Sequence, residues 1–143
     1  MKRCSWVKEN SQIYKKYHDS EWGIAKYDDR DLFELLVLEC FQAGLSWLCV
    51  LNKREDFRRS FDNFDVNKVA NYKEEKIYKL LQNEKIIRSR SKIEAAINNA
   101  KIFIKIQEEY GSFSNYIWGF TKNKIIKNTS GKIPVSTPLS DKI

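Results

Sequence analysis

Residues that interrupt helices are scarce in this 143-residue sequence, which contains five glycines and only two prolines, both within the last ten positions. Because glycine and proline end helices more readily than other residues, their scarcity predicts an all-α chain. No stretch approaches the roughly 20 apolar residues that a membrane-spanning helix needs. The first residues, MKRCSWVKEN, also lack the apolar segment of a signal peptide. We therefore expect a cytoplasmic protein without membrane contact, built as one domain or as two small interleaved lobes.

Cysteine and histidine are also few, because the chain has only Cys4, Cys40, Cys49 and one histidine, His18. An odd number of cysteines without paired spacing gives no disulfide framework. We expect Cys40 and Cys49, which lie in apolar surroundings, to be reduced core residues. A thiolate and an imidazole are both zinc ligands, but a structural zinc site needs four. From the residues alone, a free Cys4 and a surface His18 are the simpler interpretation.

Acidic residues are fewer than basic ones. The chain has 26 lysines and arginines but only 19 aspartates and glutamates, which gives a formal net charge of +7. This balance suits a polyanionic partner, and nucleic acid first. Simple solubility is the alternative interpretation, since net charge alone does not decide between the two.

Hydrophobic periodicity and capping signals predict a series of helices joined by short connections. Ser91 and Glu94 have the spacing of a capping box and place the start of the longest helix near residue 92, with Gly111 as its stop. The helices are expected over residues 11–19, 30–43, 47–60, a short segment after Asp65, 74–83, 92–110 and 112–120. This predicts a helical domain over residues 1–120. Residues 121–143, which are rich in lysine, serine and threonine, are expected to form an extended or disordered basic tail.

The longest apolar run, LFELLVLECFQAGLSW at residues 32–47, contains the carboxylate of Glu39, which is costly to bury without a partner. We expect Glu39 to line a pocket surrounded by Trp6, Tyr17, Trp22 and Trp47. Aromatic faces stack on nucleobases and attract cations, and a carboxylate accepts a hydrogen bond from an exocyclic amine. Such a pocket would suit a flipped, positively charged purine. The alternative is that the aromatic residues belong to the core and that Glu39 faces solvent or a core arginine.

A second candidate site is the pair of helices at about 74–110, whose connection carries Lys85, Arg88, Arg90 and Lys92. A short turn that leads into a helix N-terminus presents backbone N–H groups and a positive dipole end to a phosphate. A helix-hairpin-helix binds the DNA backbone in this way. An ordinary solvated helical hairpin with a basic loop is the alternative.

Four segments of the chain resemble the DNA-3-methyladenine glycosylase I (Tag) family. They are RCSWV at 3–7, YHDSEWG at 17–23, LFELLVLECFQAGLSWLCVLNKREDFR at 32–58 and IIRSRSKIEAAINNA at 86–100. The similarity covers about residues 1–140. It implies an all-α, helix-hairpin-helix DNA glycosylase of base excision repair. Such an enzyme hydrolyses the N-glycosidic bond of 3-methyladenine, a cationic lesion, in double-stranded DNA, and we expect it to act as a monomer.

The resemblance also implies roles for individual residues. Glu39 would be the catalytic residue and would recognise the amine edge of the lesion, while Tyr17 and Trp47 stack on the base and Trp6 and Trp22 close the pocket. Leu45 would fill the gap left by the flipped nucleotide. The residues expected at the DNA are Gly44, Leu45, Ile87, Arg88, Arg90 and Lys92, and the expected zinc ligands are Cys4 and His18.

The chain contains no aspartate from residue 66 to residue 140, although hairpin-type glycosylases generally place a catalytic aspartate shortly after the hairpin. The resembling family dispenses with it, because the positive charge of the lesion already makes the base a good leaving group. Catalysis would then rest on positioning and on stabilisation of charge as the bond breaks.

The chain departs from the family pattern in two respects. Lys85 and Ser91 stand where the hairpin normally has glycine, which predicts weaker DNA binding. The family also continues beyond the last residue of this sequence with a helix and with a histidine and a cysteine that complete its zinc site. We therefore expect a helix-hairpin-helix glycosylase-like bundle that lacks its last helix, with only two of four zinc ligands. A truncated, non-catalytic DNA- or base-binding relative is the alternative function.

Overall fold

The computed structural model describes residues 3–143 and is all-α, with no strand in that range. Its helices are α1 (Gln12–Ser20), α2 (Asp29–Gln42), α3 (Trp47–Ser60), α4 (Val66–Ala70), α5 (Glu74–Gln82), α6 (Arg90–Tyr110) and α7 (Phe113–Gly119). Two 3₁₀ turns, η1 (Asp62–Phe64) and η2 (Ser140–Lys142), accompany them. The predicted fold class is confirmed, and the helix bounds lie within two residues of the expected ones.

Most of these helices begin at a residue whose side chain accepts the backbone N–H three positions further on, which satisfies one of the unpaired donors of the first turn. These N-cap residues are Ser11, Asp28, Ser46, Asp65, Ser89 and Ser112. The helix starts are therefore set by local sequence. Among the α-helices of residues 3–143, only α5, which follows Lys73, lacks such a side-chain cap.

The capping box predicted at Ser91 and Glu94 is wrong. The helix α6 begins at Arg90, and its N-cap is Ser89, whose hydroxyl accepts the Lys92 N–H at 3.5 Å. The Glu94 carboxylate instead pairs with the Arg90 guanidinium one turn earlier, at 3.2 Å. The helix α6 therefore starts two residues earlier than the sequence predicted.

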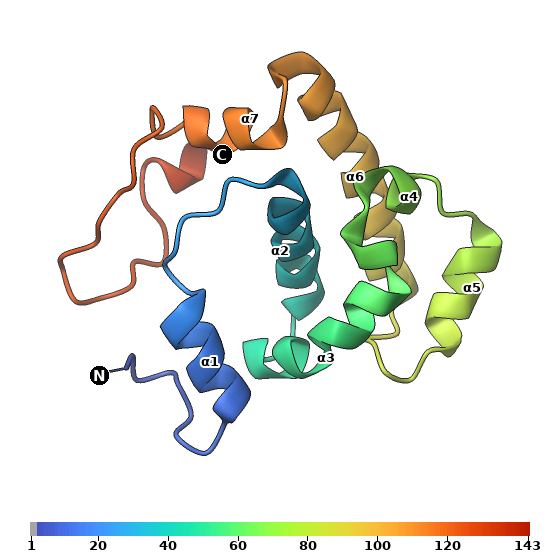
Figure 1. Cartoon of the computed structure of the whole chain (residues 1–143), viewed down its shortest axis with the longest axis horizontal. Coiled ribbons are helices and arrows are strands. Elements are labelled where there is room, and N and C mark those ends of the chain that lie inside the picture. The colour runs from blue at the N-terminus through green and yellow to red at the C-terminus, as the bar shows by residue number, and fades with distance from the viewer. Residues whose placement is uncertain (1–2) are drawn as a thin grey trace.

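The helix α2 lies in the centre of Figure 1, with α1 on one side, α6 on the other and the start of α3 beneath it. The short helices α4 and α7 both pack against α6. The connection between α2 and α3 and the connection between α5 and α6 both lie in the lower half of this view, at either end of α3. The fold thus brings two segments far apart in the sequence to the same half of the molecule.

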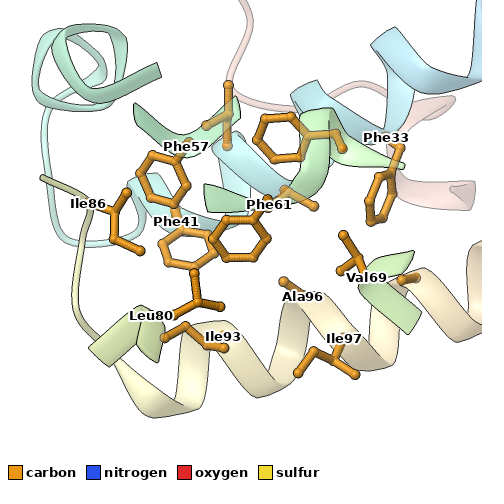
Figure 2. Close-up of a cluster of buried hydrophobic side chains, with 14 of the residues drawn as sticks. Phe33, Phe41, Phe57, Phe61, Val69, Leu80, Ile86, Ile93, Ala96 and Ile97 are labelled. Atoms are coloured by element: carbon orange, nitrogen blue, oxygen red, sulfur yellow. The ribbon is translucent and has the colours of Figure 1, made fainter. Parts of the chain in front are cut away.

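The core lies between α2, α3 and α6 and is dominated by phenylalanine rings (Figure 2). Phe41 contacts Phe57 edge to face with ring centroids 4.8 Å apart, and Phe33 contacts Phe103 at 5.2 Å. The fully buried phenylalanines are Phe33, Phe41, Phe57, Phe61, Phe64 and Phe103. Aromatic pairs of this geometry stabilise a core beyond the area that they bury, so α2 is held rigidly on its inner face.

The buried carboxylate of α2 is Glu34, which is fully inaccessible to solvent. Its oxygens accept hydrogen bonds from Arg54 Nε at 2.5 Å and from Arg58 Nε at 3.0 Å, and Arg30 Nη2 lies 2.6 Å away. Burial alone would raise the pKa of this carboxyl, but the hydrogen bonds from Arg58 and Arg54 outweigh it and hold the pKa below its ordinary value. Arg54 also donates to both carboxylate oxygens of Glu21, at 2.9 Å each. This ion cluster joins α2, α3 and the end of α1.

The prediction that Cys40 and Cys49 are core residues is wrong. Cys40 is exposed and Cys49 is half-buried, and both are free thiols, as is Cys4. Cys40 follows Glu39 on the face of α2 that turns away from the phenylalanine core, whereas Val37, Leu38 and Phe41 occupy the buried face.

The segment after α7 is mainly irregular and is followed by the 3₁₀ turn η2. Most side chains from residue 121 onward are exposed. No helix within residues 3–143 combines the length and the apolar character that crossing a bilayer demands.

Candidate active site

A pocket of about 250 Å³ opens where α1, α2 and α3 meet. Its lining residues are Trp6, Tyr14, Tyr17, Trp22, Glu39, Gln42 and Trp47. All five residues that the sequence analysis placed around this site are among them. The volume is below the roughly 300–1,000 Å³ typical of sites for drug-sized ligands, which suits a single flat base rather than a whole nucleotide.

Trp6 is the centre of the aromatic wall. Its ring centroid lies 5.2 Å from that of Tyr14 and 5.3 Å from that of Trp22, in tilted and edge-on orientations. Tyr17 completes the wall by contacting Trp47 of α3 at 5.6 Å. Tyr14, Tyr17 and His18 lie three and four residues apart on one face of α1, and all three rings contact Trp6.

The same rings also pack on a small second core formed by Val7, Tyr14 and Leu51. Trp6, Tyr17 and Trp47 lie against this cluster with one side and line the pocket with another. The two interpretations of the aromatic residues, core or pocket, are therefore not exclusive. Packing from behind fixes the rings in place before any ligand arrives.

Glu39 lies near the end of α2, and its carboxylate has no hydrogen-bond or ion-pair partner within residues 3–143. Partial burial against the pocket walls raises the pKa of this carboxyl. The pKa of the Tyr17 hydroxyl is also raised, first by burial and then by the nearby charge of Glu39. Glu39 thus has no cation beside its carboxylate, whereas the carboxylate of Glu34 is paired with arginines. An uncompensated carboxylate beside aromatic faces favours a cationic ligand.

Trp47 adds an unused donor to this pocket. Its indole nitrogen Nε1 is the only buried side-chain nitrogen or oxygen without a hydrogen-bond partner in residues 3–143. Buried polar groups are nearly always paired, and an unpaired one calls for an explanation. This nitrogen has almost no accessible surface, and it acts on the Tyr17 hydroxyl, where it opposes the rise in pKa.

The loop Ala43–Ser46, which joins α2 to α3, borders the pocket through its neighbours Gln42 and Trp47. Gly44 adopts a φ of +79°, a left-handed conformation that favours glycine. Leu45 follows it with 41 % of its surface exposed, which is a large share for an aliphatic side chain at the mouth of a site. Single exposed apolar side chains are common on protein surfaces, so it is the place of Leu45 beside the pocket that makes it a candidate for DNA contact.

The helical hairpin is formed by α5, the connection 83–89 and α6. Asn83 shapes the turn, because its side-chain oxygen accepts the Lys85 N–H at 3.0 Å and its amide donates to Ser60 at 2.8 Å. Ile86 is buried, and Ile87 packs against the core from a half-buried position. Neither Lys85 nor Ser91 has a positive φ, so the residues that replace the family's glycines cause no backbone strain here.

The basic residues of the hairpin differ in what they contact. Arg88 is exposed and has no ion-pair partner among the described residues. Arg90 bridges the two helices, with 2.5 Å between its Nη2 and the Glu74 carboxylate. The Lys92 ammonium points inward and donates to the backbone carbonyls of Phe41 at 2.9 Å and Ala43 at 2.6 Å. Arg88 is therefore the side chain of this set most available to a phosphate.

Cys4 and His18 lie together, as the sequence analysis expected of a ligand pair. The Cys4 N–H donates to His18 Nε2 at 3.3 Å, and His18 Nδ1 lies 2.9 Å from Asp19 Oδ1. A carboxylate behind a histidine is a common arrangement at metal sites. No group of three or more His, Cys, Asp or Glu side chains in residues 3–143 could hold a metal ion. Cys4 and His18 therefore lie close together, but the described residues form no metal site.

Several residues of the site were missed from the sequence. Tyr14 and Gln42 line the pocket, and their spacing of three residues from Tyr17 and from Glu39 places each on the same helix face as a predicted site residue. The sequence carried no such signal for the inward orientation of Lys92. That orientation depends on contacts with Ala43 and Phe41, which lie 49 and 51 residues earlier in the chain.

Comparison with known proteins adds the following findings. A family model described as methyladenine glycosylase matches residues 6–143. The chain is 42 % identical over 144 residues to DNA-3-methyladenine glycosylase 1 of Escherichia coli (strain K12), which covers 99 % of this chain and 76 % of that protein. A crystal structure of 3-methyladenine DNA glycosylase I is similar with a TM-score of 0.89 and 43 % identity, over 99 % of this chain and 79 % of that one. A variant of 3-methyladenine DNA glycosylase I in complex with 3-methyladenine is similar with a TM-score of 0.86 and 35 % identity, over 96 % and 75 % of the two chains.

Proposed function

The chain belongs to the methyladenine glycosylase family, and we propose that it removes 3-methyladenine from alkylated DNA by hydrolysing the N-glycosidic bond of the lesion. The observation that carries this proposal is the unpaired carboxylate of Glu39 in an aromatic pocket bordered by an exposed leucine loop. The chain is accordingly a hydrolase of DNA base excision repair.

Recognition would use both the charge and the shape of the flipped base. The faces of Tyr17 and Trp47 attract a cationic ring, and Trp6 and Trp22 limit the pocket to a flat ligand. The Glu39 carboxylate accepts a hydrogen bond from the exocyclic amine, which is also favoured by the positive charge of the lesion. An unmodified adenine lacks the charge and would gain less from the same pocket.

Catalysis would rest on the lesion as much as on the protein. When the bond between the sugar C1′ and the base nitrogen breaks, its electron pair moves to the base and neutralises the positive charge. Water then adds to C1′ and releases a proton to solvent. Glu39 is the catalytic residue in the sense that it holds the base in position while the bond breaks and the positive charge passes from the base to C1′. No general-base aspartate is needed for this route.

DNA would be held in the lower half of Figure 1, where the α2–α3 loop and the hairpin connection lie. Gly44 allows the backbone to approach the duplex, and Leu45 fills the space left by the flipped nucleotide. The start of α6 and the Arg88 guanidinium face the phosphates, since a helix N-terminus and a free cation both favour anions. Ile87 and Arg90 support this surface from the connection and the first turn. The chain would act as a monomer on double-stranded DNA.

Zinc belongs to this proposal only in part. Cys4 and His18 would supply two ligands, and when bound the metal would add a structural tie between the N-terminal segment and α1. The ion pair between Arg3 and Asp19, at 2.6 Å, already joins the same two segments. Metal analysis of the purified chain, with a Cys4→Ser variant as comparison, tests whether zinc is held at this place.

A fluorescence titration tests the base pocket directly. Free 3-methyladenine should quench the tryptophan fluorescence of the chain in a saturable manner and more strongly than adenine, because Trp6, Trp22 and Trp47 line the pocket. Glu39→Gln should weaken binding about tenfold, as expected for loss of a charge-assisted hydrogen bond. The exposed Glu55→Gln should leave it unchanged. Equal quenching by both bases, or no effect of Glu39→Gln, would contradict the assignment.

A further inference from the structure

The contact between Lys92 and the end of α2 joins the two segments proposed to meet DNA. The Lys92 ammonium donates to the carbonyl of Phe41 at 2.9 Å and to that of Ala43 at 2.6 Å. Lys92 lies in the first turn of α6, directly after the hairpin connection. Ala43 is the C-cap residue of α2 and the first residue of the Ala43–Ser46 loop. A single side chain thus spans from the hairpin to the loop that carries Leu45.

The end of α2 needs such a partner. The last carbonyls of a helix have no intrahelical donor, and a cation near them interacts favourably with the helix dipole. The last turn of α2 contains no basic residue of its own. Lys92 supplies both the hydrogen bonds and the charge from a distant part of the sequence. Hydrogen bonds to charged groups are stronger than those between neutral groups, so this contact holds the end of α2 firmly.

A second lysine makes a similar connection. Lys53 of α3 donates to the carbonyl of Lys85 in the hairpin connection at 3.3 Å. The helices on both sides of the Ala43–Ser46 loop are therefore bonded to the hairpin, one through each lysine. The Leu45 N–H donates to the Gln42 carbonyl at 2.6 Å, and apart from the Lys92 contact the other hydrogen bonds of the loop residues go to the end of α2 and to the first turn of α3. Its position depends on the two ends that the lysines fix.

We propose that Lys92 is a positioning residue that holds the Leu45 loop at a fixed offset from the phosphate-binding hairpin, and that it does not bind phosphate itself. This inference rests on the proposed function, in which Leu45 enters the duplex. If the hairpin binds the backbone while the loop is free to shift, Leu45 no longer meets the gap left by the flipped nucleotide. A displacement of about 1 Å can reduce a rate about 100-fold, so the tether should affect base flipping and excision more than DNA affinity.

The test compares Lys92→Met with Lys101→Met, a substitution at an exposed lysine of the same helix. We expect Lys92→Met to increase deuterium uptake in residues 42–48 and to lower the single-turnover excision rate about 10- to 100-fold. Affinity for free 3-methyladenine should change less than about twofold, since the pocket residues remain. Lys92→Arg, which keeps a cation with several donors, should restore part of the loop protection and of the rate. Lys101→Met should behave as wild type throughout.

The salt dependence of DNA binding separates this role from a phosphate contact. Loss of one phosphate contact lowers the slope of log K against log salt by about 0.9. The tether predicts an unchanged slope for Lys92→Met on duplex DNA with a tetrahydrofuran abasic analogue. It also predicts non-additivity, so that Lys92→Met costs little further rate when Leu45 is already alanine. A reduced slope with a normal rate, or full additivity with Leu45→Ala, would overturn the inference.

The proposed function can fail independently of the tether. If the wild-type chain releases no 3-methyladenine, the function fails, but deuterium uptake in residues 42–48 still reports on the contact. If deuterium uptake in residues 42–48 is unchanged in Lys92→Met, the tether is overturned. If uptake rises in Lys92→Met and stays at the wild-type level in Lys101→Met, the tether is supported. Should Lys92→Met fail to fold, Lys92→Arg is measured in its place. Because arginine keeps the positive charge, its salt slope should equal that of wild type. An intermediate deuterium uptake in residues 42–48 with an intermediate rate would support the tether, and increased uptake with a wild-type rate would overturn it.

Discussion

Replacing Glu34 with glutamine removes the charge at the centre of the arginine cluster while keeping the size of the side chain. Glu34 is fully buried and accepts hydrogen bonds from Arg54 and Arg58, with Arg30 also within 2.6 Å. Only 12 % of the Arg54 side chain is exposed, so its guanidinium could not regain full hydration after the change. The substitution therefore leaves the buried Arg54 charge with Glu21 alone as its anionic partner.

The expected loss of stability follows from this burial. Removing one partner of a buried ion pair costs about 3–5 kcal/mol, because the other charge stays desolvated. Glutamine retains one acceptor oxygen, so we expect the lower end, about 3 kcal/mol in the free energy of unfolding. For a domain of this size that corresponds to a fall in melting temperature of about 10 °C. Urea unfolding, with the midpoint and slope compared between variants, measures the same quantity.

Glu55→Gln is the matched control. Glu55 pairs with Arg58, one of the partners of Glu34, but 67 % of its side chain is exposed. Surface ion pairs contribute about 0–1 kcal/mol, so this change should leave the unfolding midpoint nearly unaltered. If Glu34→Gln and Glu55→Gln destabilise equally, or if Glu34→Gln costs less than about 0.5 kcal/mol, the reasoning on the cluster is refuted.

We make further predictions for Glu34 in the ion cluster, for Glu39 in the pocket and for Arg88 in the hairpin. Since the pKa of Glu34 is lowered in the folded state, the wild type should lose stability as pH falls below about 4.3, and Glu34→Gln should show a flatter acid limb in urea midpoints. The pKa of Glu39 is instead raised, so its ionised form disfavours folding at neutral pH, and Glu39→Gln should raise the melting temperature slightly while lowering excision. Excision by the wild type should also decline with acidity starting above pH 4.3, the ordinary value for a glutamate, and an acid limb at or below that value would contradict the raised pKa. Arg88→Ala should reduce the salt slope of DNA binding by about 0.9 without altering the unfolding midpoint, and an unchanged slope would show that Arg88 does not meet phosphate.

The helices could be predicted from sequence because their signals are local. Ser11, Asp28, Ser46 and Asp65 each cap the helix that follows them, and Gly111 ends α6 with a φ of +83°. Where two local signals competed, the prediction failed. Ser89 and Ser91 are both candidate caps for α6, and a pairing of Glu94 with Arg90 rather than with the backbone decided between them.

The pocket residues were predicted as a set through a resemblance rather than through spacing. Spacing alone could not choose which carboxylate of α2 is buried, and the structure assigns full burial to Glu34 and leaves Glu39 at the pocket. The two glutamates lie five positions apart and so point to different sides of the helix. Which of them is buried therefore depends on which side of α2 faces the core. The inward orientation of Lys92 was also beyond sequence reasoning, because a lysine at a helix start equally fits a phosphate contact.

Release of 3-methyladenine from alkylated duplex DNA by the purified chain tests the central claim most directly. The released bases are separated chromatographically under single-turnover conditions, with Glu39→Ala, Trp47→Ala and the exposed Lys101→Met measured in parallel. We expect wild type and Lys101→Met to release 3-methyladenine. The two pocket variants should remain folded and lose most of the excision rate. A folded wild-type chain that releases none, or pocket variants that release it at the wild-type rate, would contradict the account.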